Sequence, residues 1–174
     1  MTAAGEPLAA VIDGVVTTAQ PVHADHRGRL FEIFTGESDF WRSPVVYCYC
    51  CTIRPLQVKA WGLHLFKADR YVVISGEMTV VLYDARTDSP TYRMTQQLTM
   101  SPEAVQQLLI PVGVWHADVN VSGEEVRFLN LPTARYNHDD PDRYMLPWDT
   151  DLIPFDLRSV FPIQAQTSLR GSDS

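Results

Sequence analysis

The chain has no apolar run long enough to cross a membrane, and its first residues carry Glu6 and Asp13 without a basic start. These absences argue against a transmembrane span and against a signal or transit peptide, so we expect a cytoplasmic protein. Positive charge is also scarce, with 14 Lys and Arg against 21 Asp and Glu and a net charge of −7. This balance argues against nucleic acid or an anionic membrane as a partner, but local Arg and Lys residues can still bind an anionic small molecule.

Cysteine is rare as well, since the only three are Cys48, Cys50 and Cys51. Three is an odd number, and the spacing is not a zinc pattern. We expect buried, reduced thiols that pack as small hydrophobic side chains. A redox or metal role is the alternative.

Internal repeats and low-complexity segments are absent from the 174 residues. A chain of this length can bury about 70% of its unfolded surface as one unit. The sequence predicts a single domain over residues 1–174, with a barrel core at about 25–131. An irregular cover rich in Pro, Asp and aromatic residues is expected at 132–165, and a frayed tail at 166–174.

Short segments rich in β-branched and aromatic residues alternate with turn signals such as Ser75-Gly76 and Ser122-Gly123. The segments are residues 45–53, 70–76, 77–85, 92–100 and 125–131. This pattern is typical of an all-β fold, an antiparallel sandwich or barrel. One short helix is expected over residues 101–107, with Ser101 as the N-cap and Pro102 as the first helical residue.

Two spaced motifs carry the strongest functional signal. The first runs from Gly62-Leu63-His64 through Asp69 to Gly76, and the second places His116 shortly after Pro111-x-Gly113. Together they resemble the two signature motifs of the cupin superfamily. The resemblance implies a cupin jelly-roll β-barrel in which His64, Asp69 and His116 face one pocket. Gly62 stands where the first histidine of the usual His-x-His is found.

Further segments resemble the dTDP-4-dehydrorhamnose 3,5-epimerases. They are Asp25-x-Arg27-Gly28, Gly62-Leu63-His64, Asp84-x-Arg86-x-x-Ser89-Pro90-Thr91, Ile110-Pro111-x-Gly113-x-x-His116 and Trp148-Asp149, and they span roughly residues 25–150. The resemblance implies a cofactor-free homodimer that acts on a nucleotide-linked 4-keto-6-deoxyhexose, in deoxysugar or polysaccharide biosynthesis. In such an enzyme a base abstracts the proton next to the ketone.

Carried over by position, the resemblance assigns His64 as the base, Asp84 and His116 as pocket residues, and Tyr136 as a candidate acid. Arg27 matches an arginine that holds the diphosphate, often across the dimer. The substrate-binding set that follows from the resemblance is Arg27, Glu32, Trp61, Lys67, Arg70 and Tyr49.

Several positions depart from the family. Trp61 stands for an arginine, Tyr49 for a glutamine, and Cys51 for an asparagine. Asp69 stands for the lysine that steadies the enolate, for which Lys67 or Arg70 is the expected substitute. Asn130 stands for the proton-donating tyrosine. We find no counterpart of the C-terminal aspartate that orients the base.

Two other functions remain open at this point. One is a non-catalytic cupin that binds a sugar or nucleotide. The other is a metal-dependent cupin oxygenase or isomerase, in which His64, Asp69 and His116 would hold a divalent ion such as Fe or Mn.

Overall fold

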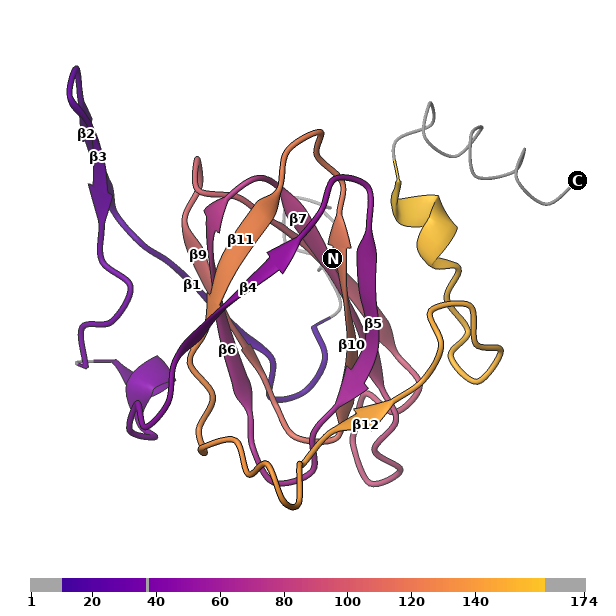
Figure 1. Ribbon diagram of the computed structural model, residues 1–174. Coiled ribbons are helices and arrows are strands. Elements are labelled where there is room, and N and C mark those ends of the chain that lie inside the picture. Colours follow the sequence, from indigo (N-terminus) through magenta and orange to yellow (C-terminus); the bar gives the residue numbers. More distant parts are fainter. Residues whose placement is uncertain (1–10, 37, 162–174) are drawn as a thin grey trace, which may run out of the picture.

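A computed structural model describes residues 11–36 and 38–161. Two five-stranded antiparallel sheets face each other as a jelly-roll β-barrel (Figure 1). The first sheet, in spatial order, contains β1 (Val16–Ala19), β9 (Gln106–Ile110), β6 (Asp69–Ser75), β11 (Val126–Asn130) and β4 (Tyr49–Ile53). The second contains β12 (Tyr144–Met145), β5 (Val58–Leu63), β10 (Val114–Asn120), β7 (Met78–Asp84) and β8 (Thr95–Met100). The predicted all-β barrel is confirmed.

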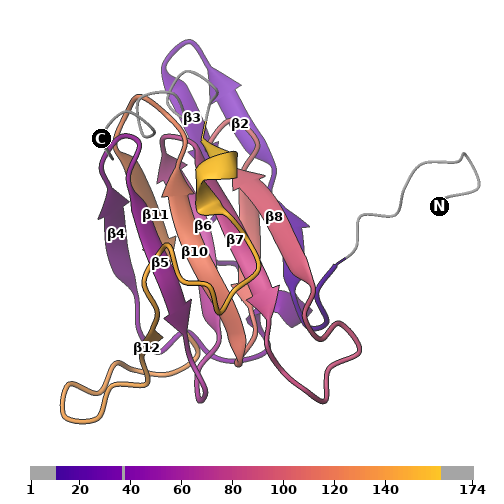
Figure 2. The ribbon, with the colours of Figure 1, turned by 90° about the vertical axis from the view of Figure 1, so that its right-hand side faces the viewer.

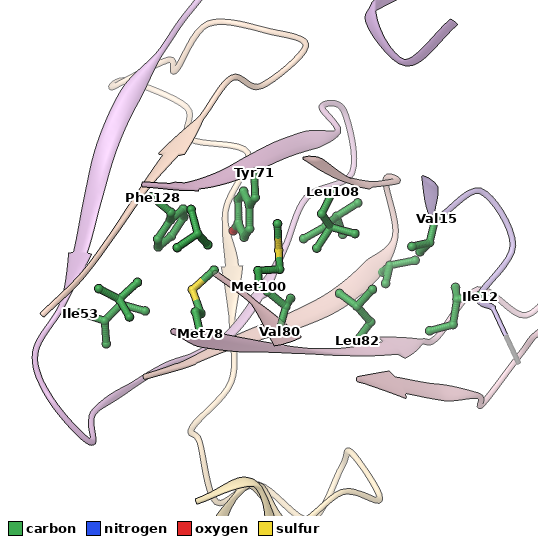
Figure 3. Packing of buried hydrophobic residues seen from close by; sticks show 14 residues of the cluster. Ile12, Val15, Ile53, Tyr71, Met78, Val80, Leu82, Met100, Leu108 and Phe128 are labelled. Atoms are coloured by element: carbon green, nitrogen blue, oxygen red, sulfur yellow. The ribbon is translucent and has the colours of Figure 1, made fainter. Parts of the chain in front are cut away.

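The hydrophobic core fills the barrel on the side of β1, β9, β7 and β8. Inward residues of both sheets meet there, among them Met78, Val80, Leu82, Leu108 and Phe128 (Figure 3). Every residue of β7 is buried, because its other face is covered as well. This explains why β7 contains the uninterrupted apolar run of residues 80–83 instead of alternating apolar and polar residues.

The covering layer is the C-terminal segment, residues 132–161. It adds β12 to the edge of the second sheet and ends in a 3-10 helix, η2 (Leu157–Val160), which crosses the outer face of that sheet (Figure 2). Ile153, Leu157 and Phe161 pack there against Trp61 and Val81. The predicted tail at 166–174 lies outside the described residues.

The helix expected over residues 101–107 is wrong. Ser101 forms an isolated bridge with Ala104, and Gln106 already begins β9. The side chain of Gln107 is fully buried and donates to the carbonyl of Ile33. Strand pairing of Gln106 and Gln107 and burial of Val105 therefore outweigh the local capping signals that favour a helix.

The prediction of buried cysteines is wrong for Cys48 and Cys50, which are exposed, while Cys51 is partly buried. All three are free thiols. Alternation along β4 turns Tyr49, Cys51 and Ile53 inward, so Cys50 faces outward.

A separate hairpin of β2 (Val22–Asp25) and β3 (Gly28–Phe31) stands away from the barrel (Figure 1). A second 3-10 helix, η1 (Asp39–Trp41), follows it. No helix in the described ranges has the length and apolar character needed to span a membrane.

Candidate active site

A cavity of about 660 Å³ opens on the β4–β5 side of the barrel, between the two sheets. Its walls are inward positions of β4 and β6 from one sheet and of β5 and β10 from the other. Tyr136, Arg143 and Met145 of the C-terminal cover border it as well. The hydrophobic core fills other parts of the barrel interior, and the buried polar residues Asp69, His116 and Asp118 line this cavity.

Three predicted site residues converge in this cavity. The Nε2 atom of His64 lies 3.3 Å from Oδ2 of Asp69, and the Nε2 atom of His116 lies 3.7 Å from the same oxygen. Asp69 is 2% exposed, so its charge is shielded from water. The two motifs, which are far apart in sequence, therefore bring these three side chains together in one cavity.

The orientation of His64 is fixed by the C-terminal cover. Its Nδ1 contacts the main-chain carbonyl of Asp142. A carbonyl only accepts hydrogen bonds, so Nδ1 carries the hydrogen and Nε2 is the nitrogen that can take up a proton. The carboxylate of Asp142 accepts the main-chain N–H groups of Leu65, Phe66 and Lys67, which holds the loop after β5 in place. The main-chain carbonyl of Asp142 thus orients His64, for which the sequence analysis found no orienting aspartate.

Asp69 is held as a carboxylate. Burial alone would raise its pKa, but its contacts with His64, His116 and Asn130 lower it overall. Its other oxygen, Oδ1, accepts a hydrogen bond of 2.9 Å from Asn130. An imidazolium at His64 is therefore stabilised by a fixed anion. Burial lowers the pKa of His116, so this second ring is neutral near pH 7.

Gly62 leaves the space that the His116 ring occupies. A Cβ atom at Gly62 would lie 2.9 Å from Nε2 of His116, too close for a normal contact. The glycine is therefore required for the position of the His116 ring beside β5.

Asp118 is a pocket residue that the sequence analysis missed. It is 5% exposed, its Oδ1 has no hydrogen-bond partner among the described residues, and Tyr71 reaches Oδ2 only at 3.5 Å. Burial, with the charge of Asp69, raises the pKa of Asp118 to about 8. The signal was present in the alternation of His116, Asp118 and Asn120, which puts all three on the inner face of β10.

The neutral form of Asp118 has a consequence for stability that can be measured. The folded protein keeps a proton that the unfolded chain releases above pH 3.8, until the pH reaches about 8. The free energy of unfolding of the parent therefore falls as the pH rises through this window. Asp118→Asn cannot ionise, so its stability relative to the parent is expected to increase from pH 5 to pH 8.5, by at most about 1.4 kcal/mol per pH unit. Urea denaturation at both pH values checks this, and parallel pH dependences would contradict it.

Basic side chains border the same cavity. Lys67 is buried, with its Nζ atom 5.1 Å from the ring centre of Tyr136. Lys59 faces inward opposite Asp118, because β5 has two residues facing one residue of β10 between these paired positions. Arg143 comes from the cover. Lys59 and Arg143 were missed, since neither the bulge nor the long-range loop contact has a sequence signature.

Arg70, which was expected to bind substrate, does not line the cavity. The side chain points away from the pocket and is fully buried. Its guanidinium donates to the carbonyls of Leu131, Ser43 and Pro44 and lies over the ring of Trp41. These contacts tie the start of β6 to the segment before β4 and to Leu131, which directly follows β11.

Asp84, which was expected as a pocket residue, does not line the cavity. It is fully buried at the end of β7 and accepts hydrogen bonds from Arg86, Ser89 and Thr91. Arg86 also donates to the main-chain carbonyl of Asp13, and Thr91 accepts a hydrogen bond from the main-chain N–H of Asp13. The family-like segment therefore organises a turn and fastens the N-terminal segment to it.

The remaining predicted contacts lie at different places. Arg27 is on the exposed β2–β3 hairpin, paired with Asp25 at 2.6 Å, and Glu32 is exposed just after this hairpin. Neither lines the cavity of its own chain. Trp61 borders the cavity, but its side chain is fully buried in the outer-face cluster and leaves no surface for a ligand. Tyr49 and Tyr136 both line the cavity.

Comparison with known proteins agrees with this geometry. The family described as dTDP-4-dehydrorhamnose 3,5-epimerase matches residues 9–168. The chain is 35% identical to the probable low-salt glycan biosynthesis epimerase Agl13 of Haloferax volcanii, over 74% of this chain and 83% of the relative. It is 30% identical to the spore coat polysaccharide biosynthesis protein SpsL of Bacillus subtilis, over 87% of this chain and 99% of the relative.

A solved structure extends the likeness to the fold. The dTDP sugar isomerase from Desulfovibrio desulfuricans G20 superposes with a TM-score of 0.77 and 25% identity, covering 83% of this chain and 90% of that one. The family match covers nearly the whole chain and includes the convergent His64, Asp69 and His116. This chain therefore belongs to the dTDP-4-dehydrorhamnose 3,5-epimerase family.

Proposed function

We propose that this protein epimerises a nucleotide-linked 4-keto-6-deoxyhexose by moving a proton on a carbon next to the ketone. The observation that carries the proposal is the setting of His64. Its Nδ1 is held by a main-chain carbonyl, and its Nε2 lies 3.3 Å from a buried carboxylate inside a cavity. A fixed imidazole with an anion beside its reactive nitrogen is well suited to general-base chemistry.

The ketone of the sugar makes the neighbouring C–H groups acidic. Nε2 of His64 takes one of these protons, and the electron pair forms an enolate with its charge on the former ketone oxygen. The imidazolium is then stabilised by Asp69. Lys67, whose ammonium is buried at the cavity wall, is the cation that we propose for the enolate oxygen. Arg70, the other residue expected in this role, does not line the cavity.

The nucleotide end needs cations for its diphosphate. Lys59 and Arg143 border the cavity and supply two of them. We propose that Arg27 supplies another in a homodimer, with the exposed β2–β3 hairpin reaching the cavity of the partner. Analytical ultracentrifugation tests this: we expect twice the chain mass of 19.7 kDa, and a monomer would contradict it.

Deuterium uptake tests the reaction itself. Incubation of dTDP-4-keto-6-deoxyglucose with excess protein in D₂O is expected to place deuterium at C3, at C5 or at both, as seen by mass spectrometry. Binding of the nucleotide sugar without any uptake would instead support a non-catalytic binding protein. Neither binding nor uptake would show that this substrate is wrong.

Gly62→Ala is expected to lower the exchange rate by about 10-fold or more, because the new Cβ displaces the His116 ring and small misplacements in an active site are costly. The melting temperature should change little, since alanine itself suits a strand better than glycine. Gly123→Ala is the matched control, because a Cβ there meets nothing within 4 Å. Equal exchange rates in both variants would contradict this role of Gly62.

A second candidate function rests on the same three residues. The ligand atoms of His64, Asp69 and His116 all lie within 4.8 Å of one another, and this donor set suits Fe(II) or Mn(II). Asp142 and Asn130 support the first two residues as outer partners. A bound ion would polarise the ketone of a substrate as a Lewis acid. Elemental analysis of purified protein separates the two candidates: one equivalent of metal favours this one, and exchange by metal-depleted protein favours the base.

A further inference from the structure

Inversion of a carbon needs a second group, which returns a proton to the face opposite the base. We propose that Tyr49 is this acid. The assignment rests on the proposed epimerase function and adds a catalytic role to a residue that had been expected only to bind substrate.

Tyr49 and His64 lie in opposite sheets. Tyr49 is the first residue of β4 in one sheet, and His64 directly follows β5 in the other. Both side chains line the same cavity. The two side chains enter this cavity from opposite sheets, so a sugar ring bound between the sheets can lie between them.

Asn130 fixes the direction of the Tyr49 hydroxyl. This amide is 1% exposed, and its Oδ1 accepts the main-chain N–H of Arg70 at 3.2 Å. Its Nδ2 must then face the other way, where it donates to the Tyr49 oxygen at 2.8 Å and to Oδ1 of Asp69 at 2.9 Å. Both amide hydrogens are thus used, and the orientation of the amide is determined by its partners.

The Tyr49 oxygen is consequently an acceptor toward Asn130, and its own O–H is free to donate into the cavity. Burial and the nearby charge of Asp69 raise the pKa of Tyr49 above its usual range, so the hydroxyl keeps its proton near neutral pH. Tyr49 is also 38% exposed, which allows water to replace the proton after each turnover.

The step balances as follows. The O–H bond of Tyr49 breaks as a new C–H bond forms on the enolate carbon, and the enolate electrons supply that bond while the ketone is restored. The phenolate that remains accepts the N–H of Asn130 until it regains a proton from water. His64 loses the abstracted proton to water as well, so the protein ends in its starting state.

Tyr136, the other candidate acid, has a different setting. Its ring lies beside Nζ of Lys67 and packs edge-on against His138 at 4.8 Å. No described residue forms a hydrogen bond with its hydroxyl. These contacts suit a residue that positions Lys67, whereas the hydroxyl of Tyr49 is oriented by a buried amide that also reaches Asp69.

The test separates proton abstraction from inversion. Parent, Tyr49→Phe, Tyr136→Phe and a surface control, Tyr92→Phe, are incubated with dTDP-4-keto-6-deoxyglucose in D₂O. NMR then measures deuterium in recovered substrate and the amount of inverted product. We expect Tyr49→Phe to lose inversion by about 100-fold. It should still exchange deuterium into substrate without inversion, because His64 is intact. Tyr92→Phe should match the parent.

An inversion rate in Tyr49→Phe within about threefold of the parent would overturn the assignment, as would a loss of inversion in Tyr136→Phe alone. The dissociation constant for dTDP should be unchanged in Tyr49→Phe, which shows that the pocket is intact. If the parent itself neither exchanges nor inverts, the proposed function fails first and the role of Tyr49 falls with it.

Discussion

His64→Asn is expected to lower proton exchange by about 10²–10⁴-fold, the usual contribution of a general base. Asparagine keeps a polar side chain of similar reach but has no nitrogen that takes up a proton at neutral pH. The measurement is deuterium uptake per unit time under saturating substrate. Because the proposed diphosphate contacts Lys59 and Arg143 remain in place, dTDP should bind with nearly the same dissociation constant.

His23→Asn is a matched control, since His23 is exposed on β2, outside the cavity. It should exchange at the parent rate. If His64→Asn exchanged as fast as this control while binding dTDP normally, His64 would not be the base. The reaction would then have to use another group in the cavity.

Asp84→Asn is expected to lower the free energy of unfolding by about 3 kcal/mol, since it removes one partner of a buried charge pair and reverses a hydrogen-bonding atom. Asp84 accepts from Arg86, Ser89 and Thr91, and the amide can satisfy only part of this set. Urea denaturation at pH 7 measures the loss. Asp88→Asn, in the exposed part of the same turn, is the control and should have little effect.

The pH dependence of this variant has a defined sign. Burial alone would raise the pKa of Asp84, but its hydrogen bonds hold it well below its usual value of 3.8. The stabilisation is therefore present above about pH 4 and is lost as the pH falls through the folded-state pKa. The difference in the free energy of unfolding between the parent and Asp84→Asn should therefore become smaller at acidic pH. A stably folded variant with a 100-fold lower exchange rate would instead restore Asp84 as a catalytic residue.

Much of the fold could be predicted because local and global signals agree. The runs that became β6, β7 and β11 are β-branched, bounded by turns, and buried once paired. The segment at 101–107 failed for the opposite reason, since its capping residues point to a helix while the buried Val105 and Gln107 belong to long-range packing. Cys48 and Cys50 failed because an edge strand leaves its outer face uncovered.

The position of a side chain in the cavity could be predicted where a reactive residue type stands at an inward-facing position of a strand. His64, Asp69 and His116 converge because each lies at an inward position near a strand end. Arg70 and Asp84 lie outside the cavity, where both form hydrogen bonds that hold neighbouring segments together. A match in sequence predicts the residue type but not the partners of its side chain. Asp142, which orients His64, comes from 78 residues further along the chain.

At positions 49 and 130, the sequence alone suggests that the family's tyrosine has been lost. In the structure, a tyrosine is still present in the same place. The family resemblance places an amide at 49 and a tyrosine at 130, and this chain has the tyrosine at 49 and the amide at 130. The two residues are direct partners across β4 and β11. The phenol and the amide have therefore exchanged strands within one hydrogen-bonded pair.

The most direct measurement of the central claim is a crystal structure of the parent protein with a dTDP-linked 4-keto sugar or a close analogue. We expect C3 or C5 of the sugar within about 3.5 Å of Nε2 of His64, the distance of a reactive approach. A metal ion ligated by that nitrogen, or a sugar bound outside the cavity between the two sheets, would contradict the role of His64 as the base.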